Sequence, residues 1–373
     1  MILRKLGAIA MAAAILAPMP AGAYKIGSTV PTQSFDDLHE TMTRLALECF
    51  DAAEGGAIDC RALLGRIATD SQRRRGSPAD GLSYATRWPD DPSRMLDNDR
   101  TLPKFGVLLA RKCSPYTGEG QRINTAGLLC SSHFGRLSFL HAMRNPGEEQ
   151  SFDEVRELML AGALFAFDTA TDKDFREGDF CDTVQKLGNA QLQDALTFSA
   201  DTFCHRRRKH VLFVIPDGWY EAWKVQTFFA LECGNSLRSL TCNELGGDVA
   251  QAAATGAILH MIQDSFSQAH VYRSDTDVDG QGALPVGPYI PRITCEIPRA
   301  VYDYEAQTAA GADIHDAADH DPMHIDASCT DQDRKVDDPL TASARVIAFI
   351  RSPQPDRAAF ERYLRSQYFP QEG

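Results

Sequence analysis

The sequence lacks the signatures of several common enzyme classes. None of the GxGxxG, GxxxxGK and GxSxG elements occurs in the 373 residues, so nothing indicates a dinucleotide-binding, P-loop or serine-hydrolase site. The 10 cysteines include no CxxC pair. That absence argues against a zinc ion held by thiolates and leaves any metal chemistry to histidine and aspartate.

Basic residues are outnumbered by acidic ones. The chain has 38 Lys and Arg against 51 Asp and Glu, which gives a formal net charge of -13 at pH 7. Such a surface disfavours loose adhesion to nucleic acid or to an anionic membrane, because both depend on basic side chains. The basic run 205–210 is a local exception, which we expect to be a solvated loop or helix end.

Long apolar runs are confined to the N-terminus. Arg4 and Lys5 precede the apolar run 6–16, and Ala21-Gly22-Ala23 follows, which is the pattern of a cleaved signal peptide. We therefore expect residues 1–23 to be removed and the mature protein to be secreted or periplasmic. Residues 24–373 contain no repeat and no clear linker, which predicts one domain.

An even number of cysteines in an exported chain predicts disulfides. Sequence does not fix the connectivity, and pairing of neighbours is the economical hypothesis. The pairs would then be Cys49–Cys60, Cys113–Cys130, Cys181–Cys204, Cys233–Cys242 and Cys295–Cys329.

Apolar residues recur at helical spacing through much of the mature chain, which predicts an all-α fold of many helices with long loops stapled by disulfides. The predicted helices are 38–50, 152–169, 187–202, 219–232, 249–271, 302–318, 340–350 and 357–368. Residues rich in Pro, Gly and Asp predict irregular loops at 76–103 and 275–291.

The predicted helix 249–271 carries polar residues inside an apolar segment. His260 and Asp264 are four residues apart, roughly 40° round a helix axis, so both side chains can reach one ion. His270 lies six residues further on, about 120° away from Asp264 on a continuous helix, and we expect it to serve a second ion. Downstream, His315 and Asp319 repeat the four-residue spacing. Imidazole nitrogens and carboxylate oxygens of this kind are zinc ligands in catalytic sites.

The order and spacing of these residues resemble the superfamily of zinc-dependent phospholipases C and single-strand-specific zinc nucleases. That resemblance implies an α-helical fold around a three-zinc cluster. It also implies ligands upstream of the predicted central helix. The family's first residue binds zinc through main-chain atoms, and Tyr24 occupies that place here, where the family usually has Trp.

Three further positions match the upstream ligands of the family. His39, in Leu-His-Glu-Thr-Met-Thr, resembles its first histidine. Asp90, in Trp-Pro-Asp-Asp-Pro, resembles its loop aspartate, with Asp91 as second choice. His133, followed by Phe, resembles the next histidine, with His141 as the alternative.

Carried over by position, the resemblance implies three ions joined by a bridging carboxylate. One ion would be bound by Asp90, His133, His260 and Asp264. The second would be bound by His270, His315 and Asp319. The third would be bound by the Tyr24 main chain, His39 and Asp264.

Such a cluster suits hydrolysis of a phosphodiester, because zinc lowers the pKa of a bound water and stabilises the attacking and leaving oxygens of an in-line displacement. Asp264 would hold the ions together, and Asp90 would orient or deprotonate the water. The Trp-Pro-Asp, Leu-His-Glu-Thr-Met-Thr and His-Phe-Gly stretches resemble bacterial phospholipases C, so the predicted substrate is a phosphatidylcholine-like lipid, cleaved to diacylglycerol and phosphorylated headgroup.

Two alternatives stay open. The spacing of His315 and Asp319 matches the nucleases, whose partner is a single-stranded nucleic acid. A secreted helical protein that binds zinc without catalysis would hold its metals fully ligated. A phospholipase would contact the membrane surface only peripherally, through loops such as 275–291, and no protein partner is indicated.

Overall fold

The computed structural model describes residues 38–53, 55–71, 81–92, 94, 128, 131–132, 135–145, 148–197, 223–233, 242–267, 270–274, 292–302, 324–331 and 336–368. Within these ranges the chain is mostly helical, with twelve α-helices. The helices are α1 (Leu38–Ala52), α2 (Arg66–Ser71), α3 (Gly81–Ala85), α6 (Phe152–Thr171), α7 (Lys173–Glu177), α8 (Phe180–Gln185), α9 (Ala190–Leu196), α10 (Val225–Phe229), α11 (Gly247–Ser265), α14 (Ala327–Thr330), α15 (Pro339–Arg351) and α16 (Arg357–Gln367).

Short elements of other kinds complete the described fold. There are two 3₁₀ helices, η2 (Arg61–Leu63) and η3 (Ser138–His141). Three two-stranded pairings accompany them: β1 (Leu231–Cys233) with β2 (Cys242–Glu244) and β3 (Val271–Arg273) with β5 (Pro298–Val301), both antiparallel, and β4 (Arg292–Ile293) with β6 (His324–Ile325), which is parallel. The predicted helical fold is therefore confirmed as the dominant structure, with small strand pairings that the prediction did not include.

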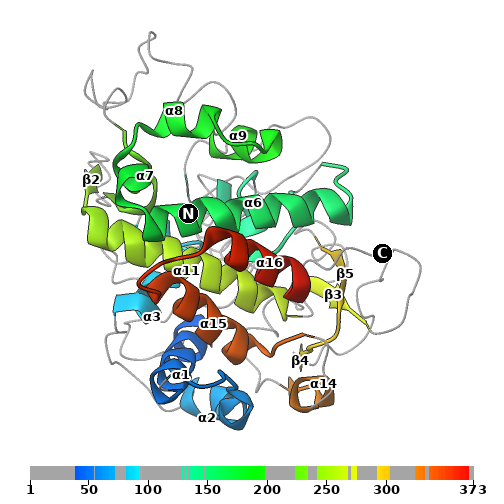
Figure 1. Cartoon of the computed structure of the whole chain (residues 1–373). Helices are drawn as coiled ribbons and strands as arrows, with labels where there is room; N and C mark the ends of the chain where they lie inside the picture. Colours follow the sequence, from blue (N-terminus) through cyan, green and yellow to red (C-terminus); the bar gives the residue numbers. More distant parts are fainter. Residues whose placement is uncertain are drawn as a thin grey trace, which may run out of the picture.

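Helix α11 is the centre of the structure. It runs through the middle of the molecule between α6 and α15, and α1 packs against α15 and also contacts α11 (Figure 1). Apolar residues occur on all of its faces, as expected of a helix surrounded by protein. All residues from Ala253 to Ser265 are buried. The polar side chains on this helix are consequently held away from solvent.

A close approach of α3 fixes one side of α11. The backbone at Ala85 passes so near Gly256 that a Cβ there would lie 2.2 Å from the Ala85 carbonyl oxygen and 2.6 Å from the Thr86 nitrogen. Only glycine fits such a contact. The contact also brings the Thr86 carbonyl to 3.0 Å from Nδ1 of His260.

The C-terminus of α11 differs from the prediction. The predicted helix continues to Val271, whereas α11 ends at Ser265 and Val271 begins β3. The buried guanidinium of Arg273 donates from Nε to the Ser265 carbonyl at 2.7 Å and from Nη1 to the Glu296 carbonyl at 2.7 Å. A side-chain donor thus satisfies a carbonyl that lacks a helical partner, and the chain turns away.

Other predicted helices agree with the structure to different degrees. The helices α1, α6, α15 and α16 lie where they were predicted, and α9 is shorter than the predicted 187–202. The predicted helix 219–232 was wrong at its end: among its described residues only Val225–Phe229 is helical, and Leu231 starts β1. That strand is stabilised by pairing with β2, a contact that local spacing does not show. The predicted helix 302–318 lies, apart from Tyr302, outside the described residues.

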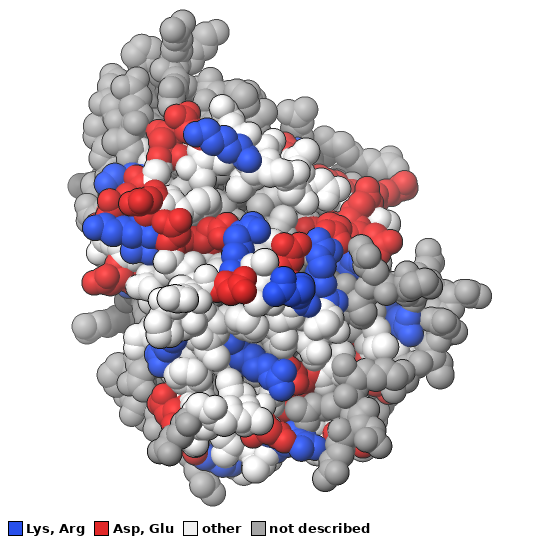
Figure 2. Space-filling model, viewed as in Figure 1, with Lys and Arg blue, Asp and Glu red and all other residues white. Residues whose placement is uncertain are grey.

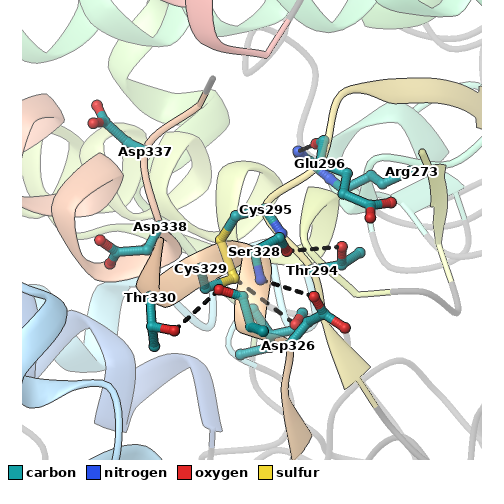
Figure 3. Close-up of a disulfide and its surroundings, with 12 residues drawn as sticks. Arg273, Thr294, Cys295, Glu296, Asp326, Ser328, Cys329, Thr330, Asp337 and Asp338 are labelled. Atoms are coloured by element: carbon teal, nitrogen blue, oxygen red, sulfur yellow. Dashed lines mark hydrogen bonds between the residues drawn. A yellow bond between two sulfur atoms is a disulfide. The ribbon is translucent and has the colours of Figure 1, made fainter. Parts of the chain in front are cut away.

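Two of the predicted disulfides are confirmed. Cys49 bonds to Cys60, which ties the end of α1 to η2. Cys295 bonds to Cys329 across 34 residues, joining the segment after β4 to α14 (Figure 3). Around this bond Ser328 Oγ accepts a hydrogen bond from the Cys295 nitrogen at 3.0 Å.

The other predicted disulfides are only partly visible. Cys181 is disulfide-bonded, and its predicted partner Cys204 lies outside the described residues, as does the pair 113 and 130. Cys233 and Cys242 are direct partners across β1 and β2. Residues opposite each other in an antiparallel pair are close enough for the predicted bond.

The surface over α6 and α16 mixes charges of both signs (Figure 2). Arg365 pairs with Glu157, and Arg357 with Asp168, at distances of 2.9 and 3.0 Å. These ion pairs tie the C-terminal helix to α6. Among the described helices, none combines the length and the apolar character that crossing a bilayer requires.

Gly256→Ala tests the α3–α11 contact. The added methyl would meet backbone atoms of Ala85 at 2.2 and 2.3 Å, which cannot yield as a side chain could. Alanine has a higher helix propensity than glycine by about 1 kcal/mol, but the clash outweighs this gain. We expect the free energy of unfolding to fall by about 2 kcal/mol or more. Urea denaturation of the variant and of wild type measures the difference in their free energies of unfolding. Gly81→Ala, in α3 with open space around its Cβ, is the matched control and should be nearly neutral. Equal stability of the two variants would show that the helices do not touch at Gly256.

Candidate metal centre

Six buried polar side chains meet beside the C-terminal half of α11. They come from five separate segments, and each is exposed by 1% or less. Their members are His39 of α1, Asp90 of the turn after α3, His141 of η3, His260 and Asp264 of α11, and His270 between α11 and β3. So many ionisable groups out of water require strong mutual compensation.

The carboxylate of Asp264 lies at the middle of this group. Its Oδ1 is 3.2 Å from Nε2 of His39. Its Oδ2 is 3.1 Å from Nε2 of His260, 3.2 Å from Nδ1 of His141 and 3.7 Å from Nδ1 of His270. The two oxygens therefore face different histidines, as a carboxylate that bridges two ions would.

Two groups of three residues have the closeness that a metal ion needs. One is His39, His260 and Asp264, and the other is Asp90, His141 and His260. Within each group the ligand atoms lie within 4.8 Å of one another. In the second group Asp90 Oδ1 is 3.9 Å from both His141 Nδ1 and His260 Nε2.

Hydrogen bonds determine which ring nitrogens carry protons. The Nδ1 of His260 lies 3.0 Å from the Thr86 carbonyl, and that of His270 lies 2.5 Å from the His141 carbonyl. A carbonyl oxygen can only accept, so each Nδ1 is the donor. In a neutral ring Nε2 then carries the lone pair. This is the second-shell arrangement that orients histidine ligands in metal sites.

The electrostatics of the centre are compatible with a bound cation. Burial lowers the pKa of His260 well below its usual value, and nearby His39 lowers it further. Burial likewise lowers the pKa of His270. The neutral Nε2 of His260 thus presents a lone pair to Asp264 Oδ2 at 3.1 Å. Nδ1 of His141 lies 3.0 Å from that nitrogen and 3.2 Å from that oxygen, so a proton on His141 or a cation would relieve the repulsion.

Asp264 leads to the same conclusion. Burial raises the pKa of Asp264, but positive charge on His270, His260 and His39 outweighs that effect and lowers it well below the usual value. Protons on His260 and His270 supply this charge only at a cost, because burial lowers the pKa of both rings. A divalent cation resolves the conflict, since it stabilises the carboxylate while the imidazoles stay neutral. The donor set of neutral imidazoles and carboxylates therefore fits a metal ion.

The structure brings five of the predicted ligands together, namely His39, Asp90, His260, Asp264 and His270. His141, the second choice for its position, also lies in the centre. Asp91 is buried beside Asp90 but belongs to neither group of three. The remaining predicted ligands, Tyr24, His133, His315 and Asp319, lie outside the described residues.

The position of His270 differs from expectation. On a continuous helix it would point away from Asp264, but because α11 ends at Ser265 the chain folds back. Its Nδ1 comes to 3.7 Å from Asp264 Oδ2. Since that Nδ1 donates to the His141 carbonyl, Nε2 is the atom available to a metal.

Sequence reasoning missed the residues that orient the histidines. Gln263 accepts from Nδ1 of His39 at 2.8 Å, and the Thr86 backbone accepts from His260. A glutamine in an otherwise apolar helix, next to Asp264, was the available signal. The role of the Thr86 carbonyl leaves no signal in the sequence, because every residue has one.

Fold and site together define a mostly helical protein with a buried histidine and aspartate centre suited to a metal ion. No protein family, curated protein or solved structure was found to match the chain.

Asp264→Asn tests the centre. The change removes the negative charge that faces His39 and His260 at 3.2 and 3.1 Å. We expect the purified variant to hold at least one divalent ion fewer than wild type, measured by elemental analysis after dialysis. Asp194→Asn, on the exposed side of α9, is the matched control and should keep the full complement. A full complement in Asp264→Asn would refute the bridging role.

Acid should destabilise the metal-free protein. The pKa values of His260 and His270 lie below the ordinary 6.5 in the folded state. Protons then bind the unfolded chain better, so stability is fully present above pH 6.5 and falls as pH drops below it. The slope should reach about 1.4 kcal/mol per pH unit for each histidine. Urea denaturation of chelator-treated protein between about pH 7.5 and 5.5 measures it.

His260→Asn is the comparison for that measurement. It removes one of the two histidines whose pKa burial lowers, so its stability should depend less steeply on pH than that of wild type. Identical slopes in the two proteins would show that His260 takes up a proton equally well in the folded and unfolded chain.

Proposed function

We propose that the protein is a secreted zinc-dependent phosphodiester hydrolase of the phospholipase C type, acting on phosphatidylcholine-like lipid. The observation that carries the proposal is the convergence of four buried histidines on the carboxylate of Asp264, with Asp90 beside them. Two confirmed disulfides support an oxidising compartment such as the periplasm or the extracellular space.

Most residues of the centre would bind zinc, and Asp90 would in addition take part in proton transfer. His39 and Asp264 would contribute to one zinc, and Asp90, His141, His260 and Asp264 would contribute to a second. Bound zinc supplies a water of lowered pKa and an electrophile for the phosphoryl oxygens. His39, His260 and His270 each donate from Nδ1 to a backbone or amide acceptor, which leaves Nε2 of each neutral ring to bind the metal.

Asp90 is the group proposed to handle the proton. Its carboxylate is nearly fully buried and lies at 3.9 Å from two ring nitrogens, at the edge of the histidine group. There it can accept a proton from the attacking water. A side-chain nucleophile is not required, because the water itself displaces the alcohol of the lipid.

The choice of lipid rests on the sequence resemblance around His39 and Asp90. A single-stranded nucleic acid would need the same chemistry at the centre, so the substrate has to be separated by assay.

The test uses the mature protein supplied with zinc. It is assayed on phosphatidylcholine vesicles and on single-stranded DNA, each with and without chelator. We expect release of phosphocholine that is lost with chelator and restored by zinc. Asp194→Asn should behave as wild type, and Asp264→Asn should lose activity by about a thousandfold or more.

The other outcomes separate the alternatives. Nucleotide release without phosphocholine release would replace the lipid with single-stranded nucleic acid. Bound zinc with neither activity would mean that the centre binds metal without catalysis.

A further inference from the structure

Gln263 is a buried amide that the proposed chemistry does not use. It lies on α11 directly before Asp264 and is 1% exposed. Because the side chain is buried, the amide costs free energy there unless its hydrogen bonds are made.

All the contacts of this amide join different helices. Its Oε1 lies 2.8 Å from Nδ1 of His39 in α1. Its Nε2 lies 3.0 Å from Oγ1 of Thr43, also in α1, and 3.3 Å from Oγ of Ser343 in α15. One side chain of α11 therefore connects the candidate metal centre with the two helices packed beside it.

The Leu82 carbonyl determines which way the hydroxyl protons of Thr86 and Thr43 point. The Thr86 hydroxyl donates to the Leu82 carbonyl at 3.1 Å, so it can only accept from Thr43 at 2.9 Å. Thr43 has then used its single proton and can only accept from the amide of Gln263.

The Ser343 side leads to the same result. Its hydroxyl donates to the Pro339 carbonyl at 2.7 Å, so it too accepts from the amide. The NH₂ group of Gln263 must face both hydroxyls, and its oxygen must face His39. An amide flipped by 180° would meet two hydroxyls whose protons are already committed.

The tautomer of His39 is thereby determined. Its Nδ1 carries the proton that Gln263 accepts, and in the neutral ring Nε2 carries the lone pair. This lone pair faces Oδ1 of Asp264 at 3.2 Å. In the opposite tautomer, Nε2–H would donate to Asp264 directly and would occupy the two atoms that a cation has to share.

We propose that Gln263 is a positioning residue that holds His39 in the Nδ1–H tautomer and so keeps the His39–Asp264 pair available to a metal ion. The inference rests on the metal centre of the proposed function but not on hydrolysis. The amide acts through His39 and touches neither the metal nor the substrate.

The first test needs no substitution. Nitrogen-15 correlation spectra of the histidine rings, recorded on metal-free wild-type protein near neutral pH and assigned with His39→Asn, report the tautomer of His39. We expect Nδ1–H. An Nε2–H ring in the wild-type protein would overturn the proposal directly.

The second test compares three variants. Gln263→Met has a similar length but no acceptor, and we expect His39 to change to Nε2–H and zinc affinity to fall by about 10- to 100-fold, measured by chelator competition. Gln263→Glu keeps an acceptor for His39 and should retain the tautomer and most of the affinity. Ser343→Ala, the matched control, removes one partner of the NH₂ group and should leave the tautomer unchanged.

The readouts distinguish positioning from general packing. If all three variants lose affinity equally while His39 keeps its tautomer, Gln263 only fills space and the proposal is wrong. Because tautomer and zinc affinity are measured without substrate, an absence of lipid hydrolysis would refute the proposed function and leave this result standing.

Discussion

The buried carboxylate of Asp264 is the constraint on which the rest of the centre depends. An anion inside an apolar helix is costly unless positive charge lies within a few ångström. Imidazoles surround it on both oxygens, but burial disfavours the protons that would make them cationic. A cation near the carboxylate of Asp264 would remove this cost, provided that several neutral histidines lie close enough to bind it. α1, η3 and α11 bring a ring nitrogen each of His39, His141 and His260 to within 3.2 Å of the carboxylate oxygens.

Backbone carbonyl acceptors fix the orientation of two histidine rings of the centre. His260 and His270 donate to the backbone carbonyls of Thr86 and His141, which cannot exchange roles as a side chain can. The Thr86 carbonyl is in place because α3 packs on α11 at Gly256. Arg273 ends α11 at Ser265 and so lets His270 return towards Asp264. Packing at distant positions thus sets the geometry of the histidines.

Much of the fold could be predicted from local pattern, because long amphipathic or apolar helices such as α1, α6, α11 and α15 impose their spacing on the sequence. Prediction was wrong where a contact distant in sequence decided the outcome. Leu231 joined a strand because it pairs with Glu244, and α11 stopped at Ser265 because Arg273 caps it. Of the centre, the close spacing of His260 and Asp264 indicated a shared position, but nothing local showed that Gln263 orients His39.

The sequence by itself determined the chemistry available, since it supplies imidazoles, carboxylates and paired cysteines in an order that resembles zinc hydrolases. It also determined that His260 and Asp264 would share one face, because helical periodicity is a local property. Only the tertiary structure decided that His39, Asp90 and His141 meet them. It also decided which nitrogen of each ring points inward, since that depends on acceptors contributed by other segments of the chain.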